Sequence, residues 1–229
     1  MRNSPNQLEN NMFIINCKNY NEIAGDKIIK IAKTAERISR KYKIPIAIAP
    51  PHHLIPLITK FKITILAQHM DDKKVGSTTG FMVPEIVKKS KIDGSIINHS
   101  EHRISEKEIK SLVKRLQKLK LKTVLCVKNV NEAKKYAKLN PTFIAIEPPE
   151  LIGTGRAIST ERPTMITNAV QVVKSARNST KLLCGAGIVS GQDVSKAKEL
   201  GSKGILVASG IVKAKNWEKV IDEFSRALV

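Results

Sequence analysis

A carboxylate followed by two prolines and a glycine-hinged segment is the stretch of this sequence best suited to chemistry. Glu147 closes a short apolar run, residues 143–146, and Pro148 and Pro149 follow it directly. A run of this length predicts a strand buried on both faces, with Glu147 at its C-terminal end and its direction set by rigid backbone. Residues 151–155, Leu-Ile-Gly-Thr-Gly, combine apolar side chains with two flexible glycines, which predicts a lid over a general base. In isolation, a solvated glutamate before an ordinary turn is the competing interpretation.

Polar residues also close two other apolar runs. Asn16 and Lys18 end the first run of the chain, and Asn98 and His99 end the fourth. Taken singly, a histidine at such a position is commonly a packed residue and a lysine a surface cation. If the strands are parallel, however, their C-terminal ends meet at one rim, where Glu147 as a base comes together with a possible electrophile, His99, and a fixed cation, Lys18. Their meeting at one rim, together with the predicted lid, favours a functional site over the packed-histidine and surface-lysine interpretations.

Two turns of small residues follow the last two apolar runs. These turns are Gly185-Ala186-Gly187 and Ala208-Ser209-Gly210. Small side chains leave backbone N–H groups free to approach an anion, and the last two strands of a closed parallel barrel are the usual place for a phosphate site. The sequence therefore predicts a phosphorylated ligand at the same rim.

Eight apolar strand patterns alternate with helical patterns along the chain. Ser105 and Glu108 form a predicted capping box before one of these helices. The predicted strands are 12–17, 46–49, 63–67, 94–98, 123–127, 143–147, 182–185 and 204–207, and the main predicted helices are 27–42, 83–89, 105–119, 130–139, 164–175, 192–200 and 217–228. This alternation predicts an α/β fold, a (β/α)8 TIM barrel. An open doubly wound sheet is the competitor, but the chain has no G-x-G-x-x-G turn of the dinucleotide-binding type.

The chain is strongly basic, with 40 Lys and Arg against 20 Asp and Glu and a formal charge of +20. Such a charge first suggests nucleic acid or an anionic membrane. The lysines recur along every predicted helix, however, and only five Phe, three Tyr and one Trp could stack on bases. We therefore expect a solvated, lysine-rich surface that attracts small anions, with no nucleic-acid partner and no membrane partner.

No linker or low-complexity segment divides the chain. Residues 1–11 are polar and predict a flexible N-terminal extension, and residues 12–229 predict a single-domain barrel. Cys17, Cys126 and Cys184 lie in apolar runs without C-x-x-C spacing, which predicts reduced core residues in a cytoplasmic protein. The apolar runs are too short to predict a membrane span.

Five motifs together resemble the triosephosphate isomerase family in its shorter archaeal form, from about Met12 to the end of the chain. The motifs are Asn16-Cys17-Lys18, Asn98-His99-Ser100-Glu101, the stretch 147–155, Cys184-Gly185-Ala186-Gly187 and Ala208-Ser209-Gly210. The resemblance implies interconversion of dihydroxyacetone phosphate and D-glyceraldehyde 3-phosphate without a cofactor or a metal, with Glu147 as base, His99 as electrophile and Lys18 as cation. It further implies supporting roles for Asn16 towards the substrate, for Glu101 towards Lys18, and for Ile152, Gly153, Gly187, Ala208 and Ser209 towards the phosphate.

The sequence leaves open two alternative functions and the oligomeric state. Another phosphate-anchored barrel enzyme would share the small-residue turns but would lack the histidine and lid motifs, and a basic nucleic-acid-binding protein would account for the charge. The long loop 68–80 predicts a subunit contact, and the resemblance implies a homodimer or homotetramer. His102, at a position where the family commonly has arginine, and the basic surface leave the oligomer contacts open.

Overall fold

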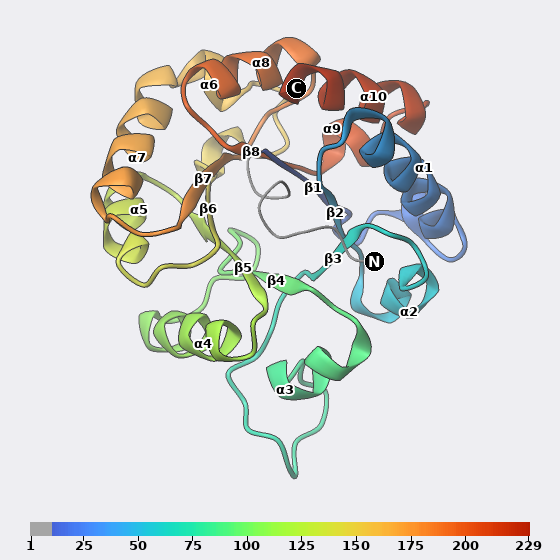
Figure 1. Ribbon diagram of the computed structural model, residues 1–229, viewed down its shortest axis with the longest axis vertical. Helices are drawn as coiled ribbons and strands as arrows, with labels where there is room; N and C mark the ends of the chain where they lie inside the picture. The colour runs from blue at the N-terminus through green and yellow to red at the C-terminus, as the bar shows by residue number, and fades with distance from the viewer. Residues whose placement is uncertain (1–10) are drawn as a thin grey trace.

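The apolar runs form eight parallel strands that pair in chain order and close into a barrel, because β8 pairs with β1 (Figure 1). The computed structural model describes residues 11–229. The strands are β1 Met12–Asn16, β2 Ile46–Ala49, β3 Thr64–Ala67, β4 Gly94–Ile97, β5 Lys122–Val127, β6 Phe143–Ile146, β7 Lys181–Cys184 and β8 Gly204–Val207. The predicted (β/α)8 barrel is confirmed, and it forms a single domain.

Alternating side chains divide the apolar residues into two layers of core. Along β1, Ile14 faces the barrel interior, whereas Phe13 and Ile15 face the helices, since successive strand residues point to opposite sides. The interior is filled by Met12, Ile14, Ala47, Ala49, Leu66, Ile96, Val124, Cys126, Phe143, Ala145, Leu183 and Leu206. The barrel is therefore a packed core, and its strand ends form a rigid rim for side chains.

Helices surround the strands as an outer ring (Figure 1). They are α1 Lys27–Tyr42, α2 Ile55–Ile58, α3 Pro84–Val87, α4 Glu106–Lys118, α5 Val130–Ala137, α6 Ile158–Glu161, α7 Pro163–Ser175, α8 Gly191–Glu199, α9 Ser209–Val212 and α10 Trp217–Leu228. The capping box of α4 is confirmed, because Ser105 accepts from the Glu108 N–H and Glu108 accepts from the Ser105 N–H. Asp26 precedes α1, but its side chain makes no capping hydrogen bond.

Predicted strand ends differ from the observed ones by about one residue. Cys17, Glu147 and Gly185 lie just beyond their strands, yet the N–H of each still donates to a carbonyl of the neighbouring strand, at 2.9, 2.9 and 3.1 Å. The helix predicted over 83–89 is shorter, because α3 covers 84–87 and a 3-10 turn follows at 88–90. These differences leave the predicted rim residues at the end of the barrel where they were expected.

The loop between β3 and α3, residues 68–83, projects beyond the ring of helices (Figure 1). Arg115 of α4 anchors the two sides of this loop: its guanidinium pairs with Asp72 at 2.7 Å and with Glu85 at 2.6 Å. Val75 and Phe81 remain exposed. The loop is thus held at its base while Val75 and Phe81 face outward.

The predicted N-terminal extension, residues 1–11, lies outside the described residues except for Asn11. The Asn11 side chain donates to the Leu228 carbonyl at 3.0 Å, so the described chain starts in contact with the last helix. Among residues 11–229, no helix is long and apolar enough to cross a membrane.

Candidate active site

Asn16 and Lys18 are held in a tight turn after β1. The buried Asn16 side chain accepts from the Lys18 N–H at 3.1 Å, and Lys18 adopts a left-handed conformation with φ of 46°. Gln68, directly after β3, donates from Nε2 to the Lys18 carbonyl at 3.0 Å and to the Ala49 carbonyl at 3.1 Å. The Lys18 ammonium pairs with Glu101 at 2.6 Å, and its side chain is only 13% exposed. The cation is therefore positioned by Asn16 at the end of β1 and by residues that follow β3 and β4.

His99 follows β4 in a turn that Asn98 stabilises. Asn98 has φ of 60°, and its amide donates to the Cys126 carbonyl at 2.9 Å and accepts from the Ile104 N–H at 3.2 Å. The imidazole Nδ1 of His99 accepts a hydrogen bond from the Glu101 N–H at 3.2 Å. A ring nitrogen that accepts from a backbone N–H carries no proton, so in the neutral imidazole this hydrogen bond places the proton on Nε2. The donor is thereby directed into the site.

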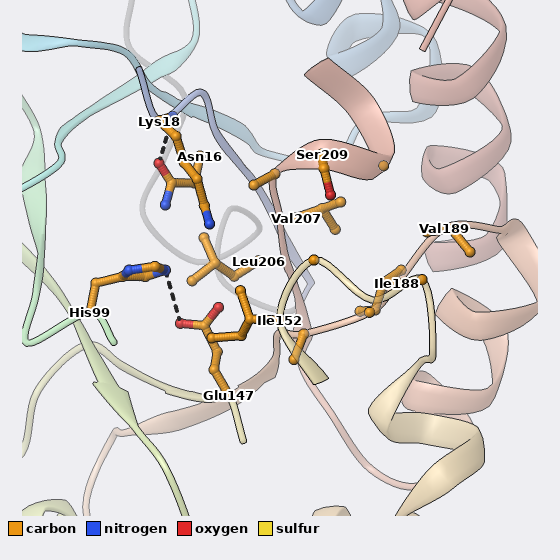
Figure 2. Close-up of a pocket in the computed structure, with 16 residues that line it drawn as sticks. Asn16, Lys18, His99, Glu147, Ile152, Ile188, Val189, Leu206, Val207 and Ser209 are labelled. Atoms are coloured by element: carbon orange, nitrogen blue, oxygen red, sulfur yellow. Dashed lines mark hydrogen bonds and ion pairs between the residues drawn. The ribbon is translucent and has the colours of Figure 1, made fainter. Parts of the chain in front are cut away.

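Glu147 lies opposite His99, where Figure 2 shows the two side chains pointing towards each other. Its Oε2 is 3.7 Å from His99 Nε2, which is too long for a hydrogen bond, and this buried oxygen has no hydrogen-bond partner among the described residues. The Cys126 thiol lies beside the carboxylate, and burial together with the nearby Glu147 raises the pKa of Cys126 well above its usual value. The carboxylate is thus positioned inside the site with one acceptor oxygen unused.

The lid residues and the two small-residue turns complete the pocket. Leu151 is buried, Ile152 is half-buried, and Gly153 and Gly155 have φ of 75° and 74°, which glycine adopts without strain. Gly187 allows close approach of the chain after the lid, because a Cβ there would lie 1.8 Å from the Arg156 carbonyl oxygen. The lid segment and the turn after β7 therefore form one continuous wall of the pocket.

The pocket collects almost every residue that the sequence predicted (Figure 2). It is lined by Asn16, Lys18, His99, Glu147, Ile152, Gly153, Gly155, Ala186, Gly187, Ile188, Val189, Leu206, Val207, Ala208, Ser209 and Gly210. Glu101 lies in an adjoining pocket and reaches the site through its ion pair with Lys18. The structure thus brings together the predicted base, donor, cation and phosphate-facing turns.

Sequence reasoning missed several contributors to the site. Gln68 follows an apolar strand in the same way as Asn16 and His99, so the same signal could have identified it. The sequence predicted Cys126 only as an ordinary core residue. The contact of its thiol with Glu147 joins different strands, so no local sequence pattern indicates that contact. The cysteines are otherwise as expected: all three are free and buried, and burial raises the pKa of Cys17 and of Cys184 to about 12.

The adjoining pocket contains several histidines. The rings of His69 and His102 stack with centroids 3.8 Å apart, and burial lowers the pKa of His69 and of His52. Within the described part of the chain, no group of three or more His, Cys, Asp or Glu side chains is arranged to hold a metal ion. These histidines lie outside the main pocket, and the titratable residues that line the main pocket are Glu147, His99 and Lys18.

Gly185 gives a direct test of how tightly Glu147 is positioned. A Cβ at residue 185 would lie 2.4 Å from the Glu147 Cγ and 2.7 Å from its Oε1, so the Gly185→Ala side chain must displace the carboxylate. We expect kcat to fall about 10- to 100-fold, since a shift on the order of 1 Å costs about that much. Gly191→Ala, which places a Cβ 3.0 Å from Glu223 away from the pocket, is the matched control. Steady-state kinetics showing equal kcat for both variants would contradict this positioning.

Comparison with known proteins agrees with the geometry. The model of the family described as triosephosphate isomerase matches residues 11–224. A triosephosphate isomerase of Cenarchaeum symbiosum is 52% identical over 217 residues, covering 95% of this chain and 97% of the relative. Those of Methanocaldococcus jannaschii and Methanothermus fervidus are 42% and 38% identical, each covering 93% of this chain and 97% and 96% of the relative. With its closed barrel and this site, the chain belongs to the triosephosphate isomerase family and is an isomerase that interconverts dihydroxyacetone phosphate and D-glyceraldehyde 3-phosphate.

Proposed function

We propose that Glu147, His99 and Lys18 carry out this isomerisation. Glu147 removes a proton from the carbon next to the substrate carbonyl, His99 donates a hydrogen bond from Nε2 to the carbonyl oxygen, and Lys18 stabilises the enediolate that forms. A glutamate base combined with a neutral histidine is already known for this family. Reprotonation on the neighbouring carbon completes the exchange between ketose and aldose, so the proposed reaction needs neither cofactor nor metal.

The orientation of His99 is the observation that carries this proposal. A neutral imidazole with its proton on Nε2 donates a hydrogen bond to a developing oxyanion, and the imidazole keeps its proton and carries no net charge. The Glu101 N–H, which occupies Nδ1 at 3.2 Å, selects that tautomer. The unused Oε2 of Glu147 faces the same nitrogen at 3.7 Å, so base and donor reach the same small volume.

Backbone groups of the lid and the two turns are the proposed phosphate ligands. Gly153, Gly187, Ala208 and Ser209 line the pocket, and their small side chains leave room for a dianion held by main-chain N–H groups of Gly153, Gly187 and Ser209 in the proposed complex. Asn16 supports the substrate next to Lys18, and Ile152 covers the reacting atoms when the lid is closed. Glu101 holds the Lys18 ammonium at 2.6 Å.

A coupled assay with D-glyceraldehyde 3-phosphate tests the assignment directly. We expect dihydroxyacetone phosphate to form without added metal or cofactor, and activity to persist after chelation and dialysis. Turnover of a different phosphorylated sugar, with none of the triose phosphate, would instead favour another phosphate-anchored barrel enzyme.

Replacing the proposed electrophile separates catalysis from binding. The His99→Gln variant should lower kcat by about 10² to 10³ and change KM far less, because the hydrogen bond to the substrate oxygen strengthens as charge develops. His53→Gln, at an exposed histidine of the adjoining pocket, is the control and should retain full kcat. If steady-state kinetics show an effect on KM alone, His99 is a binding residue.

We also propose that the enzyme is a homodimer or homotetramer assembled through the projecting loop 68–83. The loop presents Val75 and Phe81, 56% and 45% exposed, and the neighbouring Ile86 is 50% exposed, so three of the six exposed large apolar residues of the described chain lie in or beside this loop. Light scattering should give two or four times the chain mass of 25.3 kDa at micromolar concentration. The Val75→Asp variant should lower that mass, whereas Val229→Asp, at the exposed C-terminus, should not. A monomeric parent protein would rule the assembly out.

We also propose a cytoplasmic location, since the free, buried state of Cys17, Cys126 and Cys184 suits a reducing compartment.

A further inference from the structure

The fold brings ten of the 40 basic residues of the chain together at one end of the barrel, with almost no acidic residues among them. Seven connections lead from a helix to the next strand, and all seven run across the end of the barrel opposite the active site. They are residues 43–45, 59–63, 88–93, 119–121, 138–142, 176–180 and 200–203. Every one of them carries at least one cation, and together they hold ten: Lys43, Lys60, Lys62, Lys88, Lys89, Lys91, Lys120, Lys138, Arg177 and Lys203. We call this surface the basic face.

Acidic residues do not balance these cations. The seven connections contain a single acid, Asp93, and its carboxylate accepts from the Ile65 N–H at 2.8 Å. All ten cations are exposed, and none makes an ion pair with another residue of the described range 11–229. The connections at the active-site end, from each strand to the next helix, instead carry six cations and seven acids. The charge carried by the connections is therefore strongly asymmetric along the barrel axis.

Four of the ten cationic residues have a left-handed backbone conformation, which is unfavourable for residues other than glycine. Lys43, Lys91, Lys120 and Arg177 have φ of 54°, 58°, 53° and 52°, the left-handed conformation in which a helix usually ends with glycine. Cations at helix C-termini interact favourably with the helix dipole, which explains a preference for Lys or Arg in the last turn. The dipole does not explain why a side chain replaces glycine at these four positions. It also does not explain extra cations after the one-turn helices α2 and α3.

We propose that the basic face binds the phosphate backbone of double-stranded nucleic acid, separately from the isomerase site. Its cations are distributed over the whole end of the barrel, which suits a rigid rod with closely spaced phosphates, on which lysines act as point charges. Phe61 is the one aromatic residue in the seven connections; it is half-buried and lies under the Lys60 ammonium, 5.6 Å from the ring centroid. The face therefore offers no platform for unstacked bases, which single strands require.

The same connections argue against an anionic membrane as the partner. Peripheral membrane binding combines cations with apolar side chains that enter the lipid. The exposed large apolar residues of the described chain are Leu57, Val75, Phe81, Ile86, Val189 and Val229, and none of them lies in the basic face. The inference departs from the expectation drawn from the sequence, because lysines that look evenly spread along the chain become concentrated when the seven connections meet.

A charge-matched pair of variants tests the proposal. In the basic-face variant, Lys43, Lys91, Lys120 and Arg177 are replaced by glycine, which suits their left-handed backbone, so the fold should be retained. In the control variant, four exposed helical lysines elsewhere, Lys30, Lys107, Lys134 and Lys219, are replaced by glutamine, which lowers the net charge equally. Binding to a mixed-sequence DNA duplex of about 20 base pairs, to the single strand of the same length and to phosphatidylserine vesicles is measured from 50 to 200 mM salt, alongside isomerase activity.

We expect the parent protein to bind the duplex at 50 mM salt. Its affinity should fall by about 100-fold or more at 200 mM salt, because at least four phosphate contacts give a loss of that size. The basic-face variant should bind the duplex at least about 30-fold more weakly than the parent, and the slope of its log affinity against log salt concentration should be smaller in magnitude by about 3.6. The affinity of the control variant should stay within about threefold of that of the parent. All three proteins should retain full isomerase activity, which keeps this test independent of the mechanism. The proposal is overturned by equal losses in both variants, by no duplex binding at 50 mM salt, or by tighter binding to single strands or vesicles.

Discussion

Replacing Glu147 with glutamine should lower kcat by about two to four orders of magnitude while leaving the fold intact. The amide has nearly the size of the carboxylate, so it fills the same buried space beside Gly185 and Cys126. It cannot accept a proton from carbon, however, and the unused Oε2 that faces His99 is lost. Because the base acts in the chemical step, KM should change little by comparison.

The neighbouring acid of the same segment provides the control. Glu150 is exposed and pairs with Arg162 at 2.7 Å, away from the pocket. The Glu150→Gln variant removes the same charge three residues further on and should keep full activity. A Glu147→Gln enzyme within tenfold of the parent, measured in the coupled assay with an unchanged circular dichroism spectrum, would sink the assignment of the base.

Shortening the lid should change the product as well as the rate. The enediolate can eliminate its phosphate to give methylglyoxal, so the enzyme must hold the phosphate and exclude water until reprotonation. Leu151 is buried and Ile152 lines the pocket, and the Gly153 N–H is a proposed phosphate ligand. Deleting residues 151–154, with Glu150 joined to Gly155, should lower kcat sharply and make methylglyoxal and free phosphate a substantial fraction of the product.

A point variant keeps this prediction testable if the deletion does not fold. Gly153→Pro retains the chain length but removes the N–H and cannot adopt the observed φ of 75°. It should therefore also raise the share of methylglyoxal. Gly80→Pro, at φ of 81° in the projecting loop, imposes the same backbone change away from the pocket and should not. A lid-deleted enzyme that folds, isomerises and yields no more methylglyoxal than its parent means that the segment is not a lid.

The sequence alone predicts much of the architecture. The alternation of short apolar runs with amphipathic helices requires a parallel sheet covered by helices, and eight such units without a dinucleotide-binding turn indicated closure into a barrel. Glu147, His99 and Lys18 could be brought together in advance for the same reason: in a parallel barrel the C-terminal ends of all strands form one rim. The parallel topology by itself therefore places residues that are far apart in the sequence at one site.

Other features depend on contacts between strands, and local sequence carries no sign of them. The space that Gly185 leaves for Glu147 and the approach of the Cys126 thiol to that carboxylate became visible only in three dimensions. The charge distribution is the clearest case. Along the sequence the lysines appear evenly spread, whereas the fold brings all seven helix-to-strand connections to one end of the barrel. Hydrophobic periodicity is a local property that one segment displays by itself, but an electrostatic field or a hydrogen-bond partner is set by which segments become neighbours.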